Sequence, residues 1–371
     1  MSTQAFIPLP SSPNICRRQA ADSLEPPPSA PILAPEKGSG SVRDIQPIIS
    51  IITPTMQRPG LLRRLLGTMA ANAPWILEHI VVDGEDGAES RALAADYPNV
   101  SVLPGPDRNS HHALNKGIAA ARGEIIGFVN TDDRIRPGAL AAVQAYFEHH
   151  PGCVMLRTAC HLAPLDAPPG HEPLELHHLG DEAGLLAVLL FGTPGFNAWF
   201  FRRDFLQRHG GLPDTDTAPG TAPGASGVLD ERYVIAADRD LLLRLYFAGF
   251  RPDYLPLPVY VYGLHEASAT LNNAGRGVEQ QLAEHIKIAE RLRPAARAAT
   301  GAAAAMLDAW GAFELWVLVR VQWREGRRAA ALALLGRAWA AAPDLPFRLW
   351  RARAQRAALI AQVKRERGEA C

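Results

Sequence analysis

Short apolar runs alternate with amphipathic stretches through the first two thirds of the chain. Each run is four or five residues long and ends in polar or turn-forming residues, which predicts a buried strand. The stretches between the runs carry apolar residues at helical spacing, as at Leu61, Leu65 and Met69. The predicted strands span 48–52, 79–82, 100–103 and 125–129, and the predicted helices span 60–72, 90–97, 112–122 and 137–149. This alternation is typical of βαβ units and a mostly parallel sheet.

The pattern is less regular beyond residue 150. An apolar stretch over 185–190 precedes a predicted strand at 198–202, and 236–248 has the spacing of an amphipathic helix. Prolines interrupt 254–262, which therefore predicts an edge strand or an extended segment. From about residue 277 the composition shifts to Ala, Leu, Arg and Trp, and helices are predicted near 279–292, 302–323, 328–341 and 347–367.

These changes divide the chain into three predicted parts. Residues 1–46 are rich in Pro, Ser and Ala and lack apolar periodicity, which predicts a disordered leader. Residues 47–275 form the predicted α/β domain with a mixed sheet flanked by helices. Residues 276–371 form a predicted all-α extension. A single helical hairpin near 325–343 resembles one tetratricopeptide-like unit, but one unit alone is a weak signal.

Composition narrows the class of protein. The 371 residues are 47% hydrophobic, and 38 basic residues balance 38 acidic ones. This balance gives no reason to expect nucleic acid as a partner. The four cysteines have no Cys-x-x-Cys spacing, so they predict neither a cysteine metal site nor a disulfide framework, and a reducing cytoplasm is expected. No secretory signal and no uninterrupted apolar run of membrane-spanning length is visible.

Two adjacent carboxylates follow the most apolar predicted strand. Asp132 and Asp133 follow 125–129 after Asn130 and Thr131, at the end of a parallel strand where α/β sheets bind ligands. Like charges at a buried strand end repel each other unless a cation lies beside them. Mg²⁺ prefers oxygen ligands from few carboxylates and from substrate phosphates, so one interpretation is a metal–diphosphate site. The alternative is a turn or helix cap, a role that Asn, Thr and Asp also suit.

Other acidic residues occupy comparable positions. Asp83 follows the predicted strand 79–82, and Asp238 and Asp240 open the predicted helix 236–248. Because the carboxyl ends of parallel strands share one edge of a sheet, Asp83 and the pair at 132–133 are expected in one cleft. Each carboxylate alone has an ordinary explanation as a turn or cap residue, but all of them together favour a functional site.

Several stretches resemble family 2 glycosyltransferases of the GT-A fold, over roughly residues 48–270. The most specific is Ala-Leu-Asn-Lys-Gly-Ile-Ala-Ala-Ala-Arg-Gly-Glu-Ile-Ile-Gly-Phe-Val-Asn-Thr-Asp-Asp at 113–133. The others lie at 49–55, 80–84, 200–204 and 235–245. The resemblance implies a GT-A domain with a Rossmann-like sheet that transfers a sugar from a nucleotide-sugar with inversion. It also implies a divalent cation, Mn²⁺ or Mg²⁺, and a glycan or lipid-linked acceptor.

The resemblance also implies roles on the donor side. Asp83 matches the position that contacts the nucleotide base, and a carboxylate can accept from a uracil imide N–H, so a UDP-sugar is favoured. The backbone at Thr53 and Pro54 would line the nucleotide pocket. Asn115 would approach the donor, and its alternative is a helix residue that faces the sheet. In the family's Asp-x-Asp motif the first position is Asn130 here, and we expect Asp133 to bind the metal while Asp132 contacts the ribose or sugar.

The remaining implied roles concern catalysis. Asp238 matches the family's general base, which takes a proton from the attacking acceptor hydroxyl. Asp240 is the second candidate, and for both the alternative is a first-turn Asp favoured by the helix dipole. His265 would reach the metal or the diphosphate, or would be an ordinary surface histidine. His111 and His112 are expected to be loop residues without a role.

Three other interpretations remain for comparison. A dinucleotide-dependent oxidoreductase needs a Gly-x-Gly-x-x-Gly turn after the first strand, where this chain has Thr-Pro-Thr. A nucleotide-sugar-binding protein without catalysis would lack the base, yet Asp238 is present. A nucleotidyltransferase would carry a Gly-rich, basic phosphate loop near the first strand, of which Arg58 and Gly60 are only a faint sign.

Arginines recur along the predicted all-α extension, at positions 348, 351, 353, 356, 365 and 367. They predict either a solvated helix face or peripheral contact with anionic lipid headgroups. The expected location is accordingly the cytoplasm, with contact at the inner face of the membrane as the alternative.

Overall fold

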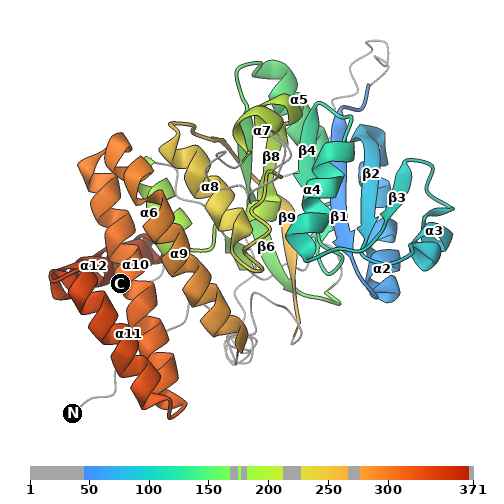
Figure 1. Cartoon of the computed structure of the whole chain (residues 1–371). Helices are drawn as coiled ribbons and strands as arrows, with labels where there is room; N and C mark the ends of the chain where they lie inside the picture. The colour runs from blue at the N-terminus through green and yellow to red at the C-terminus, as the bar shows by residue number, and fades with distance from the viewer. Residues whose placement is uncertain (1–45, 168–173, 177–181, 212–226, 266–275, 367–371) are drawn as a thin grey trace, which may run out of the picture.

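A mixed β-sheet with helices on both faces occupies one side of the molecule, and long helices extend from it on the other (Figure 1). The computed structural model describes residues 46–167, 174–176, 182–211, 227–265 and 276–366. Within those residues one sheet has the strand order β3-β2-β1-β4-β8-β6-β9-β5, and β7 pairs with β6. The strands are β1 (Ile49–Thr55), β2 (Ile76–Asp83), β3 (Val100–Pro104), β4 (Ile125–Phe128), β5 (Arg134–Ile135), β6 (Met155–Pro164), β7 (Leu174–Leu176), β8 (Trp199–Arg202) and β9 (Asp253–Leu264).

The pairing separates a parallel half from a mixed half. Strands β3, β2, β1 and β4 pair in parallel, so their carboxyl ends lie on one edge. Strand β8 pairs antiparallel with β4 and β6, and β6 pairs in parallel with β9. The predicted α/β class with a mixed sheet is confirmed.

Two strands differ from their predicted form. Strand β1 continues through Thr55, where 53–55 was predicted to end it, because these residues stay in register with β2 as far as the pair Thr55–Asp83. Strand β9 is flanked on both sides, by β6 and by β5. Its prolines are accommodated by a bulge in β9, because the consecutive β6 residues Thr158 and Ala159 pair with Leu255 and Pro258.

Helices cover the two faces of the sheet. They are α2 (Pro59–Met69), α3 (Ala88–Ala94), α4 (Ser110–Ala120), α5 (Ala139–His149), α6 (Glu182–Phe191), α7 (Arg203–His209) and α8 (Ala237–Phe247). Short 3₁₀ turns span Ala70–Trp75 and Phe196–Ala198. The C-terminal helices are α9 (Arg276–Ala299), α10 (Gly301–Arg324), α11 (Arg328–Ala341) and α12 (Leu345–Glu366).

The larger hydrophobic core crosses from the sheet into the C-terminal helices. Phe201 of β8, Leu242 of α8, Ile288 of α9 and Trp310 of α10 all belong to one buried cluster. A second cluster on the opposite face joins β1 and β4 to α2 and α5. The predicted boundary near residue 276 stays a prediction, and the side chains of α9 and α10 pack into the same core as α8.

Helix α10 has the length and composition of a membrane span. It is the one such helix among the described residues. Asp308 and Glu314 interrupt its sequence, and 44% of its most apolar 18-residue stretch is buried inside the protein. Because Leu307 and Trp310 are fully buried in the core shared with α8, we interpret α10 as a core helix.

Candidate active site

The carboxyl edge of the parallel strands holds Asp83. It lies in register with Thr55 of β1 and Pro104 of β3, and it is buried. One carboxylate oxygen accepts from the backbone N–H of Glu85 at 3.0 Å, and the other accepts from Ser90 Oγ at 2.5 Å. Two hydrogen bonds leave acceptor capacity on this carboxylate, which has about four lone-pair sites.

Thr53 has its side chain engaged within the sheet. Its Oγ1 lies 2.8 Å from Nε2 of His79 on β2, and both residues are buried. Burial lowers the pKa of His79 to about 4, so this imidazole is neutral at physiological pH. The pairing of β1 with β4 ends at Ile52, so the backbone of Thr53 and Pro54 is not paired with β4.

The turn after β4 buries Asp133. The phenol of Tyr260 donates to Asp133 Oδ2 at 2.6 Å, the backbone N–H of Gly263 donates to Oδ1 at 2.8 Å, and the Asn130 amide donates to Oδ2 at 3.2 Å. Burial, followed by the neighbouring charge of Asp132, raises the pKa of Asp133 to about 7. Three donors from the protein therefore already occupy the residue that was predicted to bind the metal directly.

Asp132 faces the other way. Its Oδ2 lies 3.0 Å from Nε2 of His265 and 3.5 Å from Nη1 of Arg58. Its side chain is 16% exposed, and that of Arg58 is 49% exposed. The structure thus brings His265 to Asp132, whereas the sequence analysis grouped His265 with Asp133.

Gly263 sets the distance between β9 and this turn. A Cβ at this position would lie 2.1 Å from the carbonyl oxygen of Asp132. No side chain fits there without moving backbone. Glycine thereby lets β9 supply both the Gly263 N–H to Asp133 and His265, two residues later, to Asp132.

The two candidates for the base lie in the first turn of α8 but have different surroundings. Asp240 is fully buried, accepts from Arg244 Nε at 2.9 Å and pairs with Arg291 of α9. Asp238 is partly exposed, and its carboxylate accepts from the backbone N–H of Arg239 at 2.6 Å. Asp240 therefore ties α8 to α9, while Asp238 faces the solvent side.

Tyr262 of β9 is surrounded by acidic groups. Burial, followed by the charges of Cys160, Asp133 and Asp238, raises the pKa of this phenol well above its ordinary value.

The start of α8 is held from outside the predicted α/β domain. Its N-cap residue is Ala236, which offers no side-chain cap. Instead, Glu284 of α9 accepts from three consecutive backbone N–H groups, those of Val234, Ile235 and Ala236, each at 2.9 Å. The sequence analysis missed Glu284, and the only signal for it is a predicted helix start without a capping side chain.

Arg239 secures the same turn to α6. Its guanidinium donates to the carbonyl oxygens of Leu189, Leu190 and Gly192, at 3.1 Å to Leu190 and 2.8 Å to Gly192. It also lies over the Trp310 ring of α10. The residues on either side of Asp238 are thus fixed by α6, α9 and α10.

Asn115 holds a loop next to the site. Its amide donates to Leu229 O at 2.8 Å and to Glu231 Oε1 at 2.9 Å, and its Oδ1 accepts from Leu229 N at 2.9 Å. A Cβ at Gly227 would lie 2.0 Å from Asn115 Nδ2, so the loop passes very close. The hydrogen bonds of the Asn115 side chain are thus made within the protein. Its predicted contact with the donor stays a prediction.

Asp107 is a further acidic residue that the sequence analysis missed. Its Oδ1 lies 2.9 Å from both Lys116 Nζ and His112 Nδ1. Its Oδ2 is buried and has no hydrogen-bond partner among the described residues. A Cβ at Gly84 would lie 3.5 Å from this oxygen, so Asp107 borders the end of β2. His112, expected to have no role, thus pairs with a carboxylate near Asp83, and His111 contacts Tyr233 O at 3.0 Å.

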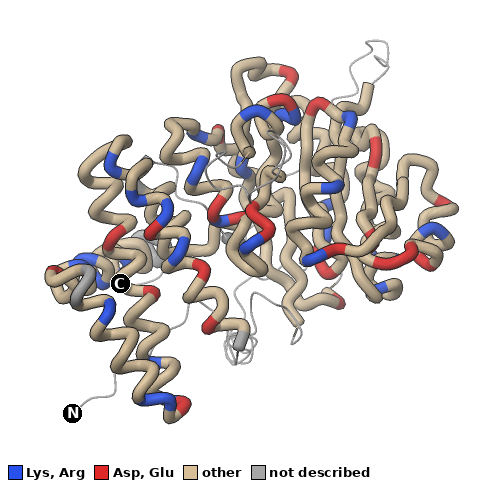
Figure 2. The backbone as a smooth tube through the Cα atoms, in the orientation of Figure 1, with Lys and Arg blue, Asp and Glu red and all other residues tan. Residues whose placement is uncertain are grey.

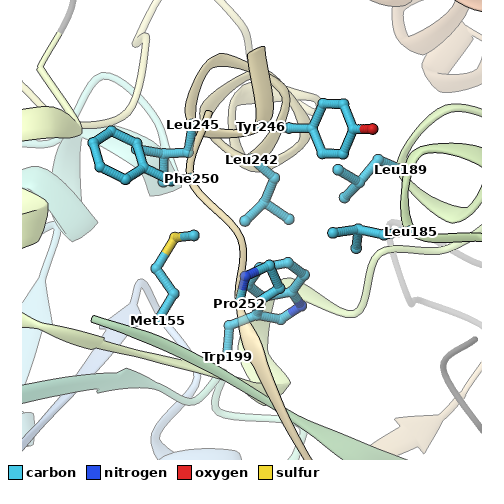
Figure 3. Close-up of a pocket in the computed structure, with 9 residues that line it drawn as sticks. All are labelled: Met155, Leu185, Leu189, Trp199, Leu242, Leu245, Tyr246, Phe250 and Pro252. Carbon is cyan, nitrogen blue, oxygen red and sulfur yellow. The ribbon is translucent and has the colours of Figure 1, made fainter. Parts of the chain in front are cut away.

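The pocket in Figure 3 is not this site. Met155 of β6, Trp199 of β8, Leu189 of α6 and Leu242 of α8 are among its apolar lining residues. None of the predicted site residues lines it. We interpret it as a packing gap between the sheet and the helices.

A divalent cation fits Asp132 and His265. Their facing atoms are 3.0 Å apart, and a carboxylate oxygen and an imidazole nitrogen are both ligands for Mn²⁺. Within the described residues no group of three or more His, Cys, Asp or Glu could hold a metal. A cation here would therefore depend on further ligands from a substrate diphosphate or water, as Mg²⁺ and similar ions often do.

Residues 50–209 match the family model described as glycosyl transferase family 2. This part of the chain is a family 2 glycosyltransferase domain. The matched segment contains Asp83, Asn115, Asp132 and Asp133, while Asp238 and His265 lie beyond it. The family predicted from the motifs is confirmed.

Two curated relatives match parts of the chain. An uncharacterized protein of Mycobacterium tuberculosis (strain CDC 1551 / Oshkosh), MT1568, is 33% identical over 113 residues, which are 29% of this chain and 35% of that protein. The O-antigen biosynthesis protein RfbC of Myxococcus xanthus is 29% identical over 259 residues, which are 65% of this chain and 18% of that protein. The matches thus span about a third or less of each relative.

A solved structure supports the fold. The crystal structure of S. aureus TarS 1-349 in complex with UDP-GlcNAc aligns with a TM-score of 0.57 at 17% identity. The alignment covers 86% of this chain and 92% of that one. At this identity the likeness concerns the fold, and it confirms the predicted GT-A architecture.

Proposed function

We propose that the chain is an inverting glycosyltransferase that moves a sugar from a nucleoside-diphosphate sugar to an acceptor hydroxyl, with Asp238 as the general base. The observation that carries this proposal is the different environment of Asp238 and Asp240. Asp240 is buried in ion pairs with arginines, whereas Asp238 is partly exposed at a helix start that Glu284 and Arg239 hold in place. A base needs a fixed position and an available oxygen, and Asp238 has both.

Asp132 and His265 are the proposed cation ligands. This proposal revises the expected division, because Asp133 is already engaged by Tyr260, Gly263 and Asn130. Asp133 instead holds β9 against the turn and so keeps His265 beside Asp132. When bound, a divalent cation would offset the negative charge that develops on the departing diphosphate.

The residues at the ends of β2 and β3 are proposed to bind the donor nucleotide. Asp83 retains acceptor capacity, and Asp107 Oδ2 is a buried acceptor without a partner among the described residues. Base N–H groups would supply the missing donors. A UDP-sugar fits this arrangement because the uracil imide can donate to a carboxylate, and TarS, a protein of the same fold, was crystallised with UDP-GlcNAc.

The proposed reaction is a single displacement. The acceptor oxygen attacks the anomeric carbon while the bond from that carbon to the diphosphate oxygen breaks. Asp238 takes the proton of the attacking hydroxyl, and the nucleoside diphosphate leaves on the opposite side of the sugar. General-base help of this kind contributes about 10²–10⁴ in rate.

The acceptor is proposed to be a glycan or a lipid-linked glycan, reached from the cytoplasmic side. The support is the similarity of 65% of the chain to part of an O-antigen biosynthesis protein.

A screen of nucleotide-sugars by thermal shift, with Mn²⁺ and with EDTA, tests the proposal. A ligand that binds only the folded protein raises the unfolding temperature by mass action. We expect a UDP-sugar to stabilise the protein in Mn²⁺, and the same sugar to be transferred to an acceptor or slowly to water. Stabilisation without any turnover would favour the non-catalytic sugar-nucleotide-binding alternative, and release of pyrophosphate from a nucleoside triphosphate would favour a nucleotidyltransferase.

A further inference from the structure

The C-terminal helices leave several large apolar side chains exposed to solvent. They form what we call the aromatic surface: Trp323 (48% exposed), Leu332 (57%), Trp339 (54%), Phe347 (56%) and Trp350 (65%). Soluble proteins bury most side chains of this size, and exposed groups of them usually mark an interaction site. The described apolar residues of the α/β domain with comparable exposure are scattered ones such as Met56 and Val234.

Helix α11 contributes an almost entirely unburied face. It is built of Ala and Leu with one Trp, one Gly and two Arg, and Ala331 is the one buried residue among its described side chains. Leu332 and Trp339 are seven residues apart, two helical turns, and so lie on the same side. Figure 1 shows α11 at the edge of the molecule beside α10, far from the sheet. Within the described residues, the side of α11 that carries Leu332 and Trp339 is exposed to solvent.

Helix α12 carries two further exposed rings. Three residues separate α11 from α12, so Trp339 near the end of one helix is close in sequence to Phe347 in the first turn of the other. The rings of Phe347 and Trp350 stack with their centroids 5.7 Å apart. The two exposed rings thus form one flat apolar patch.

The same segment has a strong positive charge. Between residues 320 and 361 the chain has nine arginines and two acidic residues, Glu325 and Asp344, although the whole chain is neutral. Figure 2 marks basic positions along α11 and α12 in blue. Charge asymmetry of this kind within a neutral chain indicates an anionic partner.

Several of these arginines are available for such a partner. Arg324, Arg337 and Arg353 are exposed, and no ion pair involves them within the described residues. Two others lie over rings of the aromatic surface, Arg328 over Trp323 at 5.6 Å and Arg351 over Phe347 at 5.9 Å. Cationic and aromatic groups are therefore mixed within one surface.

We propose that the aromatic surface and its arginines dock the protein on a membrane that contains anionic lipids. Trp is enriched at the level of the headgroups, where its ring meets the acyl chains, and Arg binds lipid phosphates. The helices would lie in the plane of the interface and not cross it. Docking needs no glycosyl transfer, so it can be tested independently of the proposed function.

Two other partners fit less well. A second copy of the chain would bring two strongly basic segments together, and like charges oppose such contact. Nucleic acid offers anionic phosphates and stacking for the rings, but it offers no apolar phase for Leu332 and the alanine-rich face of α11.

Vesicle sedimentation with the full chain tests the proposal. The vesicles contain phosphatidylcholine alone or with about one third phosphatidylglycerol, at roughly 0.05 M and 0.5 M salt. The first variant replaces Arg324, Arg337, Arg351 and Arg353 with Gln, and the second is Trp339→Ser with Trp350→Ser. The control carries Arg63→Gln and Leu77→Ser, at exposed positions of the α/β domain.

We expect binding to the anionic vesicles at low salt and little binding to phosphatidylcholine alone. The four Arg→Gln changes should weaken binding at least about 100-fold, since each basic residue near an anionic surface adds several-fold to affinity. The Trp variant should show weaker quenching of its tryptophan fluorescence by brominated acyl chains, because Trp323 is the one tryptophan of the aromatic surface that it retains. The control should bind like the unchanged protein, and all variants should keep its unfolding temperature.

Other outcomes would overturn the proposal. These are equal binding to neutral and anionic vesicles, no vesicle binding at low salt, or unchanged binding in both variants. Binding of duplex or single-stranded DNA that depends on the four arginines, without vesicle binding, would identify nucleic acid as the partner. A dimer in sedimentation velocity that the Trp variant dissociates, without vesicle binding, would identify a second copy.

Discussion

Glu284 Oε2 of α9 accepts the backbone N–H of Ala236 at 2.9 Å, two residues before Asp238. The same carboxylate also accepts from Val234 and Ile235. A side chain from the C-terminal helices thus binds the backbone of the N-cap residue and of the two residues before it, whereas a Ser, Thr or Asp at the N-cap would accept from N–H groups inside the helix. The position of the proposed base therefore depends on α9, although α9 carries no proposed catalytic group.

Replacement of Glu284 by Gln tests this dependence. The amide retains one acceptor oxygen for three donors and turns an N–H₂ group toward them, so we expect a loss of about 2 kcal/mol of stability. Because the start of α8 loosens, kcat should fall more than KM changes. Unfolding by urea and steady-state kinetics measure the two effects.

Glu290→Gln on the same helix is the matched control, because Glu290 is exposed. It should leave both quantities unchanged. Equal kcat in the Glu284 variant and the unchanged protein would show that the contact stabilises the fold without positioning Asp238.

Substitution of the two adjacent aspartates, one at a time, tests which of them binds the cation. Asp132→Asn and His265→Gln should each weaken Mn²⁺-dependent UDP binding by about tenfold or more, which is about 1.4 kcal/mol per tenfold. Calorimetric titration with UDP in Mn²⁺ and in EDTA gives the measurement. Binding that is the same in EDTA would rule out a cation at this site.

Asp133→Asn should act differently. It removes the charged acceptor of Tyr260 and Gly263, and we expect it to lower stability by about 1–3 kcal/mol. Any effect on UDP binding should come through the displaced β9. If Asp133→Asn abolishes the Mn²⁺ dependence of UDP binding while Asp132→Asn retains it, Asp133 is the metal ligand, as the sequence predicted.

His79 gives the fold a pH dependence. Its pKa is about 4 in the folded protein and about 6.5 in the unfolded chain. Between these values the unfolded chain binds a proton that the folded protein does not, so stability falls as the pH is lowered from 6.5 to 4. The full effect is about 3 kcal/mol, at about 1.4 kcal/mol per pKa unit.

His79→Gln removes this contribution and retains a group that can bond to Thr53 Oγ1. Urea unfolding at pH 6.5 and pH 4 should therefore show the variant losing about 3 kcal/mol less than the unchanged protein. Asp133, with its raised pKa, acts in the opposite direction, favouring the folded state as the pH falls, and it is present in both proteins. Identical losses in the two proteins would show that His79 takes up a proton as readily in the folded protein as in the unfolded chain.

The strands of the parallel half could be predicted from the sequence because their signal is local. An apolar run followed by polar residues identifies β2, β3 and β4 without knowledge of their neighbours. The carboxylates at the ends of β2 and β4 follow from the same rule, since parallel strands share one carboxyl edge.

The direction of each adjacent carboxylate could not be predicted. Asp132 and Asp133 differ by one position, and the contact that distinguishes them comes from Tyr260, more than a hundred residues later. Glu284 is likewise about fifty residues from the N–H groups that it accepts. Such pairings depend on which elements pack together, and a propensity or a period does not encode that.

Asp238→Asn is the decisive test of the proposed reaction, with Asp240→Asn as its neighbour two positions along. Asp238 is partly exposed and forms no ion pair with an arginine in the part of the chain that the structure describes, so its amide variant should keep the stability of the fold and the affinity for the donor. Turnover should fall by about 10²–10⁴, because the proton is taken only during transfer.

Asp240→Asn should instead destabilise the protein by about 3–5 kcal/mol, because Arg244 and Arg291 lose their buried counter-charge. Rates of sugar transfer together with urea unfolding separate the two effects. A rate loss in a stable Asp240 variant would move the base to that residue, and full activity in the Asp238 variant would remove the mechanism proposed for this enzyme.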